Sequence, residues 1–144
     1  MLLISHRGNI NGRQQTWENY PSYIEKAISS GYDCEIDVWY NKGEWYLGHD
    51  TADHSVNYDF LTNEKLWCHA KTIESLDAMS KLDDIHCFWH ENDRYTLTSK
   101  KYIWAYPGFN VPVGSKSICV VPERCNMDVS NFYGVCSDFV ERYK

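Results

Sequence analysis

The sequence predicts an α/β fold, a reduced (β/α) barrel of about seven to eight mostly parallel strands with several outer helices missing. Three observations lead to this expectation. Short β-like runs recur along the whole chain, amphipathic helices lie between the early runs, and a strand–helix–strand order is typical of a parallel sheet. The chain has 144 residues, whereas complete barrels of this kind typically have about 250. Loops must therefore replace some helices.

Seven main strands are expected, and an eighth follows a hairpin turn at Asn41-Lys42-Gly43. The main strands are expected at Leu2–Ser5, Cys34–Tyr40, Leu66–Ala70, His86–His90, Tyr102–Tyr106, Ser117–Val121 and Tyr133–Ser137, and the eighth at Trp45–Gly48.

Two helices have clear signals. The first is expected from about Trp17 to Ser30, where apolar residues recur at helical spacing and Gly31 provides the stop. The second is expected over Thr72–Leu82, with the Thr72 hydroxyl as N-cap. A short helix is expected near Asn57–Asn63. The segment between Tyr106 and Ser117 is too short for a helix of ordinary length that would cover the sheet.

The composition is that of one packed domain over residues 1–144. Hydrophobic residues make up 43% and aromatic residues 15%, which excludes a disordered chain. No apolar run approaches the roughly 18–20 residues that span a bilayer, so no transmembrane segment is expected. The net charge of −6 argues against non-specific binding to nucleic acid, which needs a basic face.

The cysteines predict a cytoplasmic protein. Four of the six, Cys34, Cys68, Cys87 and Cys119, lie in apolar strand-like runs, where reduced core cysteines are common. The N-terminus has no cationic leader followed by an apolar stretch of signal-peptide length. A disulfide framework is the alternative. Exposed aromatic residues on a barrel short of helices would favour a homodimer.

Two carboxylates occupy one face of an expected strand. In the run from Cys34 to Val38, alternate residues share a face, so Glu35 and Asp37 point to the same side. Two like charges this close raise each other's cost of ionisation. A divalent metal would remove that cost and bind both groups, and a salt bridge to Arg7 or Lys71 is the alternative.

Other expected strands end in polar groups of the same kind. The first strand runs into His6 and Arg7, the third presents His69 and Lys71 on one face, and the hairpin strand leads to His49. In barrels of this class, reactive groups come from the C-terminal ends of strands. These residues therefore predict a site at one mouth of the barrel.

The motifs together resemble those of a known family. His6-Arg7-Gly8, Glu18-Asn19, Glu35-x-Asp37-Val38 and His49-Asp50 resemble the signature of glycerophosphodiester phosphodiesterases in order and spacing. The similarity covers residues 6–50 and, more weakly, residues 134–142. It implies a TIM-type barrel that hydrolyses a small phosphodiester with a divalent metal ion, Mg²⁺, Ca²⁺ or Mn²⁺.

The resemblance also implies roles for single residues. His6 and His49 would be the general acid and base, and Glu35 and Asp37 would bind the metal. Arg7 would contact the phosphate, and Glu18 would line the site and hold neighbouring groups.

One position departs from the family pattern. Where the family usually has a third acidic ligand followed by Lys, this chain has His69-Ala70-Lys71. Lys71 matches, as a residue of the phosphate site. His69 would either ligate a transition metal such as Mn²⁺ or Zn²⁺ or bind phosphate directly. The segment between His49 and Leu66 also lacks the family's inserted subdomain, which leaves the substrate alcohol open.

Three hypotheses follow. The first is a metal-dependent phosphoric diester hydrolase of reduced size. The second is a module that binds phosphorylated ligands without turnover. The third is a metal-independent lyase that uses two histidines and an arginine, although it would leave Glu35 and Asp37 without a partner cation.

Further polar and aromatic residues follow the later strands. His86 and His90 would lie about 13 Å apart on a strand, too far to share a metal. Pocket-lining positions are expected for His90, Glu91 and Asp93, with Glu123 and Asp138 as weaker candidates. Trp104 and Tyr106 are expected mainly in the core.

Overall fold

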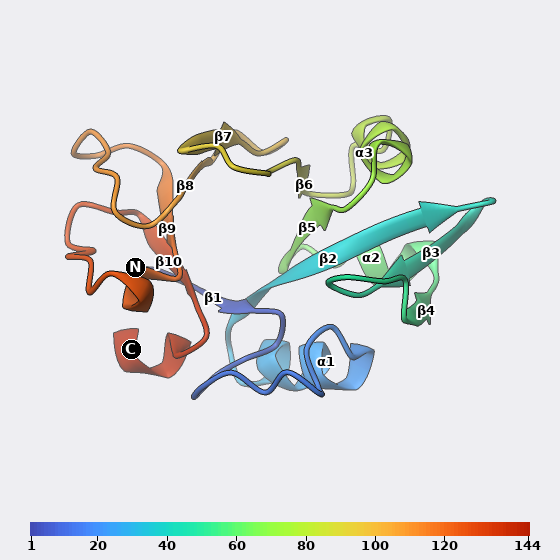
Figure 1. Ribbon diagram of the computed structural model, residues 1–144, viewed down its shortest axis with the longest axis horizontal. Coiled ribbons are helices and arrows are strands. Elements are labelled where there is room, and N and C mark those ends of the chain that lie inside the picture. Colours follow the sequence, from blue (N-terminus) through green and yellow to red (C-terminus); the bar gives the residue numbers. More distant parts are fainter.

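Ten strands form a single mixed sheet (Figure 1), as seen in a computed structural model that describes residues 1–144. Along the main path, the neighbours are β6-β5-β2-β1-β10-β9-β8-β7, and the hairpin strands β3 and β4 extend from β2. The strands are β1 Leu2–His6, β2 Asp33–Asn41, β3 Glu44–Leu47, β4 His54–Val56, β5 Leu66–Ala70, β6 Cys87–Phe88, β7 Tyr95–Leu97, β8 Ile103–Ala105, β9 Ser117–Val120 and β10 Gly134–Ser137.

The sheet curves into a half-barrel. Six of its nine pairings are parallel, and those of β3 with β2, β4 with β3 and β7 with β8 are antiparallel. β1 lies near the centre, paired with β2 on one side and β10 on the other. The first and last strands of the chain, β1 and β10, are therefore neighbours in the middle of the sheet. Because β1, β2, β5 and β10 are parallel, their carboxyl ends point to the same edge.

The expected reduced TIM-type barrel is wrong. β6 has two residues and pairs only with β5, so no ladder closes the sheet between β6 and β7 or β8. The α-helices lie only before β6, and no α-helix follows any later strand. The connections after β6 are too short for helices of ordinary length, and the chain crosses between parallel strands by loops and single 3₁₀ turns instead.

The helices lie around the β2–β5 half of the sheet, whereas the β7–β10 half carries mainly loops (Figure 1). They are α1 Pro21–Ser29, α2 Tyr58–Leu61 and α3 Ile73–Ser80, followed by the 3₁₀ turns η1 Pro122–Arg124 and η2 Val140–Tyr143.

The second expected helix is confirmed, with Thr72 as its N-cap in a capping box with Ser75. The first begins later than expected. Pro21 occupies the first turn of α1 and fixes its start there. The residues from Trp17 to Asn19 instead form a turn in which Asn19 is left-handed at φ 65°, and Tyr20 is the extended N-cap residue.

The core has two main parts. Beneath α1 and α3, the outer face of β2 and β5 buries Cys34, Ile36, Val38 and Cys68. The concave side is filled by a second cluster that includes Ile4, Trp67, Phe88, Trp104, Ile118 and Cys136. All six cysteines are unpaired, and only Cys125 is exposed. Trp104 is 2% exposed, which confirms its expected core position.

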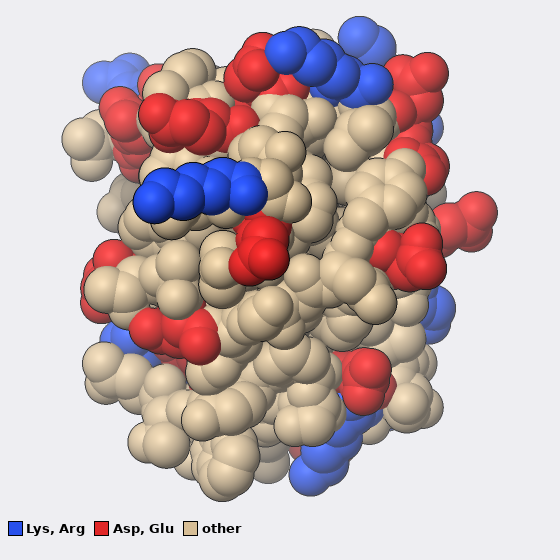
Figure 2. Space-filling view, turned by 90° about the vertical axis from the view of Figure 1, so that its right-hand side faces the viewer, with Lys and Arg blue, Asp and Glu red and all other residues tan.

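Charged groups are mixed on the face shown in Figure 2. Acidic and basic side chains alternate there, and no continuous basic area is visible. Among the helices, none has the length and apolar character needed to cross a membrane.

Candidate metal and phosphate site

Two carboxylates and one imidazole converge where the carboxyl end of β5 lies beside the middle of β2. Asp37 of β2 is in register with His69 of β5, and Glu35 lies on the same face of β2, as expected from the alternation. One ligand atom from each of the three residues lies within 4.8 Å of the others. His69 Nδ1 is 3.2 Å from Asp37 Oδ1 and 3.8 Å from Glu35 Oε1.

The carboxylates of this cluster are buried and incompletely paired. Glu35 is 2% exposed and Asp37 is fully buried, and Glu35 Oε2 and Asp37 Oδ1 have no hydrogen-bond partner. Burial and the charge of Asp37 raise the pKa of Glu35 well above its usual value. Orphaned buried acceptors are costly, and a divalent cation would satisfy both. The donor set of two oxygens and one nitrogen fits such an ion and leaves coordination positions for a substrate.

Asp37 is also surrounded by basic side chains. Arg7 Nε lies 3.0 Å from Oδ2, His49 Nδ1 lies 3.5 Å from the same oxygen, and Lys71 Nζ lies 3.6 Å from Oδ1. Burial opposes ionisation of Asp37, but the contacts with His49 and His69 and the charge of Arg7 outweigh it. The pKa of Asp37 therefore lies well below its usual value. The salt-bridge alternative is thus present at Asp37, whereas the nearest groups to Glu35 are imidazoles.

Asn19 fixes the position of Asp37. Its Nδ2 donates to Asp37 Oδ2 at 2.9 Å, and its Oδ1 accepts from the Asp37 backbone N–H at 2.9 Å. Both Asn19 and Arg7 have left-handed backbones, with φ 65° and φ 56°. Such conformations cost energy and concentrate at functional sites. The Glu18-Asn19 motif pointed to this position, but its contact with Asp37 was not predicted.

The two expected acid–base histidines have different environments. His6 is 7% exposed, with Nδ1 2.7 Å from Asp138 Oδ1 and Nε2 3.8 Å from Glu35 Oε2. His49 has a 41% exposed side chain that faces the pocket. Burial opposes ionisation of Asp138, but its contacts with His6 and Asn9 lower its pKa below the usual value. Asp138 is therefore ionised and holds the His6 ring.

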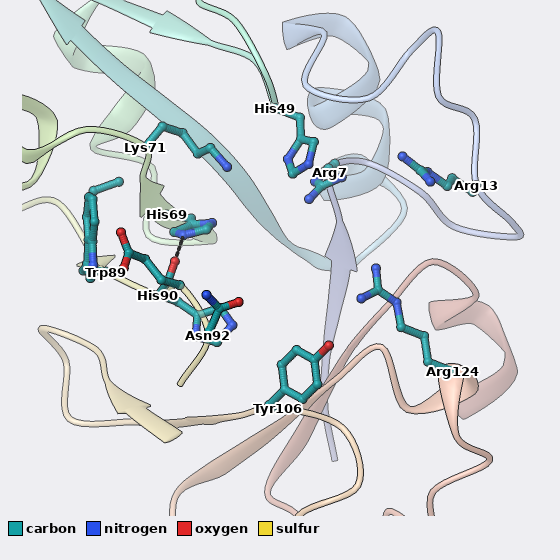
Figure 3. A pocket seen from close by; sticks show the side chains of 12 residues that line it. Arg7, Arg13, His49, His69, Lys71, Trp89, His90, Asn92, Tyr106 and Arg124 are labelled. Carbon is teal, nitrogen blue, oxygen red and sulfur yellow. Dashed lines mark hydrogen bonds between the residues drawn. The ribbon is translucent and has the colours of Figure 1, made fainter. Parts of the chain in front are cut away.

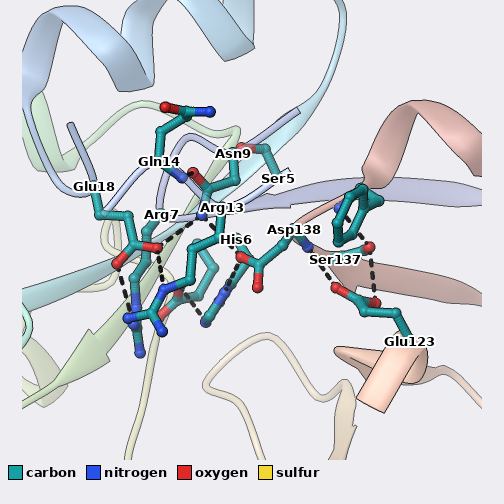
Figure 4. Close-up of polar contacts among 12 residues, drawn as sticks. Ser5, His6, Arg7, Asn9, Arg13, Gln14, Glu18, Glu123, Ser137 and Asp138 are labelled. Atoms are coloured by element: carbon teal, nitrogen blue, oxygen red, sulfur yellow. Dashed lines mark hydrogen bonds and ion pairs between the residues drawn. The ribbon is translucent and has the colours of Figure 1, made fainter. Parts of the chain in front are cut away.

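A polar network surrounds this histidine (Figure 4). Glu18 accepts from Asn9 Nδ2 at 3.0 Å and from Arg13 Nε at 2.9 Å, and its other oxygen lies 3.5 Å from Arg7. Glu18 therefore holds two arginines, in line with the holding role that the resemblance implies. Glu123 similarly holds Asp138 in place, because its carboxylate accepts a hydrogen bond from the Asp138 backbone N–H at 2.9 Å.

A pocket of ≈ 740 Å³ opens above the cluster (Figure 3). Among the residues expected to line it, His90 and Glu91 do so, as does Tyr106, which was expected in the core. Asp93 does not line it. The residues of its wall are Arg7, Arg13, His49, His69, Ala70, Lys71, Trp89, His90, Glu91, Asn92, Tyr106 and Arg124.

His86 and His90 lie apart, as expected. His86 is buried against Trp67 and contacts Thr98 Oγ1 at 2.7 Å. His90 lines the pocket, where its backbone oxygen lies 3.0 Å from His69 Nε2.

All eight residues expected in the site lie in one connected group, although they come from five segments of the chain: His6, Arg7, Glu18, Glu35, Asp37, His49, His69 and Lys71. Sequence reasoning missed Arg13 and Arg124, which carry no strand-end signal, and assigned no role to Asn19 although it lies in one of the motifs. In comparisons with known proteins, no family model matches the chain, and neither a curated protein nor a solved structure matches it.

Proposed function

We propose that this protein is a metal-dependent phosphodiester hydrolase that uses two histidines for acid–base catalysis, as in the glycerophosphodiester phosphodiesterases that its motifs resemble. The observation that carries the proposal is the convergence of Glu35, Asp37 and His69 within 4.8 Å beneath a pocket lined by cations. The basic side chains that line the pocket can bind the negative charge of a phosphodiester. Together with a metal ion on the acidic cluster below, they can stabilise the further negative charge of its transition state.

Glu35, Asp37 and His69 would hold the divalent ion. When bound there, the ion supplies Lewis-acid stabilisation of the charge that develops on the phosphoryl oxygens. Arg7 and Lys71 both line the pocket (Figure 3) and contribute further positive charge to a bound phosphate. Their contacts with Asp37 hold both side chains next to the cluster.

His6 is the better candidate for the general base. Ionised Asp138 accepts from the Nδ1–H of the ring, which leaves the Nε2 lone pair facing the cluster. His6 can then take a proton from a water molecule or from a neighbouring hydroxyl of the substrate. His49 reaches the pocket from the loop after β3 and is exposed enough to protonate a leaving alcohol oxygen.

The test is hydrolysis of bis(p-nitrophenyl) phosphate by the full chain. Activity should disappear in EDTA and return with Mg²⁺, Ca²⁺ or Mn²⁺, and the Glu35→Gln variant should not regain it. Activity that resists EDTA would favour the metal-independent lyase instead and would contradict the role of the cluster.

A second candidate function is binding of phosphorylated ligands without turnover. It is favoured by the ion pairs of Asp37 with Arg7 and Lys71, which already neutralise part of the cluster without a metal. Under this hypothesis, inorganic phosphate would bind equally well with and without EDTA, and no added metal would produce hydrolysis.

A further inference from the structure

The wall of the pocket carries more positive charge than one phosphodiester requires. Arg7, Arg13, Lys71 and Arg124 all line it, whereas Glu91 is its only acidic residue. This concentration of cations occurs in a chain with a net charge of −6. A cleft lined by one sign of charge attracts ligands of the opposite sign.

The four cations fall into two groups. Arg7 and Lys71 contact Asp37 at 3.0 Å and 3.6 Å and belong to the cluster on the floor. Arg13 and Arg124 do not contact that cluster. Arg13 uses Nε to bind Glu18, which leaves its terminal nitrogens to the pocket. Arg124 has no carboxylate within 4.0 Å.

The guanidinium groups of Arg7, Arg13 and Arg124 lie on one side of the pocket, across from His69 and Lys71 (Figure 3). Glu18 contacts both Arg7 and Arg13 and offsets part of their mutual repulsion, whereas Arg124 adds a like charge to the same side with no such carboxylate. A bound anion removes this repulsion, and a guanidinium is well suited to bind carboxylate or phosphate through two nitrogens.

The backbone holds Arg124 at the pocket at some cost. Val121, just before the η1 turn, has φ 39°, a genuine outlier for a β-branched residue. Its N–H donates to Cys136 O at 2.7 Å, and Glu123 binds Ser137 Oγ and the Asp138 N–H. The turn is therefore fixed to the end of β10, beside the site. Strain of this kind typically persists where it serves a function.

We propose that Arg13 and Arg124 form a second anion subsite, so that the preferred substrate is a phosphodiester whose alcohol carries its own carboxylate or phosphate. This inference rests on the proposed function for the scissile phosphate, which Arg7, Lys71 and the cluster on the floor bind. The scissile phosphate then binds to Arg7 and Lys71, and the second anionic group of the same substrate binds to Arg13 and Arg124.

Two ligands of nearly equal size test the subsite. Glycerophosphoglycerol has a neutral alcohol, and glycerophosphoglycerate has a carboxylate in place of one CH₂OH group. Their dissociation constants are measured by calorimetry on the full chain in EDTA, where no hydrolysis is expected. The anionic ligand should bind about tenfold tighter or better, as expected for one new charge-assisted contact.

Variants assign the preference to the two arginines. Arg13→Gln and Arg124→Gln should each reduce it, and Arg124→Lys should retain part of it because the charge remains. Lys26→Gln is the matched control, since it removes the same unit charge from exposed α1 surface outside this pocket and should leave the preference unchanged. A separate hydrolysis assay of both ligands with added metal reports on the proposed function.

Equal affinity for the two ligands, or a preference that survives in Arg124→Gln and Arg13→Gln, would overturn the subsite while leaving the hydrolase proposal standing. Absence of hydrolysis with every metal, together with an arginine-dependent preference in binding, would overturn the hydrolase proposal and retain the subsite.

Discussion

At the scale of single residues, the buried acidic pair opposes the stability of the fold. Glu35 and Asp37 lie next to each other with little exposure to solvent, and Glu35 Oε2 has no partner. Removing a buried charge that is incompletely paired is favourable in the absence of a ligand. Residues that bind a metal or a substrate commonly carry such a cost.

The first prediction concerns Glu35→Gln. In EDTA, this variant should be more stable than the wild type by about 1–2 kcal/mol, because it keeps the shape of the side chain and removes a carboxyl group whose ionisation is opposed by burial and by Asp37. Added Mn²⁺ should raise the melting temperature of the wild type and not that of the variant. Both are measured by thermal and urea unfolding. A variant that is destabilised in EDTA would show that Glu35 is a structural residue.

The second prediction concerns the two histidines. His6→Ala and His49→Ala should each lower kcat for bis(p-nitrophenyl) phosphate by about 10²–10⁴-fold, the usual range for loss of a general acid or base. His54→Ala serves as the matched control, because that histidine lies on β4 outside the pocket. Circular dichroism checks the fold. Retained turnover in either site variant would reject the two-histidine assignment.

At the scale of elements, the turn after β1 determines where Arg7 and Asn9 lie. Gly8 has φ +93°, and a Cβ on it would lie 2.5 Å from Tyr23 Cδ1 of α1. The turn is therefore packed directly against α1, and Tyr23 donates a hydrogen bond to Asn9 Oδ1 at 3.3 Å. Only glycine allows both the backbone conformation and this close approach.

The third prediction is that Gly8→Ala destabilises the protein by about 2–4 kcal/mol, as the sum of left-handed strain and overpacking. Gly31→Ala is the matched control. Gly31 has a similar φ of +96° but nothing within 4 Å, so only the strain of about 1–2 kcal/mol applies. Urea unfolding measures both. The difference between the two variants should shrink in a Tyr23→Ala background, and an unchanged difference would contradict the contact argument.

The elements predicted from the sequence are those with strong local signals. The Leu66–Ala70 strand, the hairpin turn before Glu44 and the Thr72 cap are confirmed. β4 and β7 were missed, because each has three residues and is stabilised by its hairpin partner rather than by its own pattern. The strand expected at His86–His90 is shorter in the structure, where β6 covers only Cys87–Phe88, because it has a partner on one side only.

In the site too, local sequence patterns could be predicted, whereas contacts that depend on strand pairing could not. Residues on one strand, such as Glu35 and Asp37, were predicted to share a face from period-two alternation alone. The contact between His6 and Asp138 joins residues 132 positions apart, and only the pairing of β1 with β10 brings them together. Arg124 was missed for the same reason, because its position depends on how η1 is fixed to β10.

At the scale of the whole molecule, the site lies where the sheet is best supported. β1, β2 and β5 are each paired on both sides, and β10 is paired with both β1 and β9. At the open edge, β6 is separated from the acidic pair on β2 by β5. A half-barrel can therefore hold the same strand-end groups as a closed barrel, because the strands that carry them are adjacent.

Near the open edge, the stability of the whole fold depends on a buried histidine outside the site. His86 is 3% exposed, packs against Trp67 with ring centroids 4.2 Å apart and contacts Thr98 Oγ1 at 2.7 Å. Burial and the charge of Lys100 lower the pKa of His86 to about 4. The folded protein therefore contains a neutral imidazole at this position, and the unfolded chain has one of ordinary pKa.

The fourth prediction follows from this difference. Between the folded pKa of about 4 and the ordinary pKa of 6.5, the unfolded chain binds more protons, so stability falls as the pH decreases through this window. The loss from His86 alone should be about 2 kcal/mol at a pH of about 5. The control is His86→Gln, which can still bind Thr98 but does not titrate. Urea unfolding of both proteins across the window should show a steeper loss in the wild type, since the carboxylates common to both contribute equally. Parallel stability curves would mean that His86 is already protonated in the folded state, or that its ring reaches solvent through the gap beside β6.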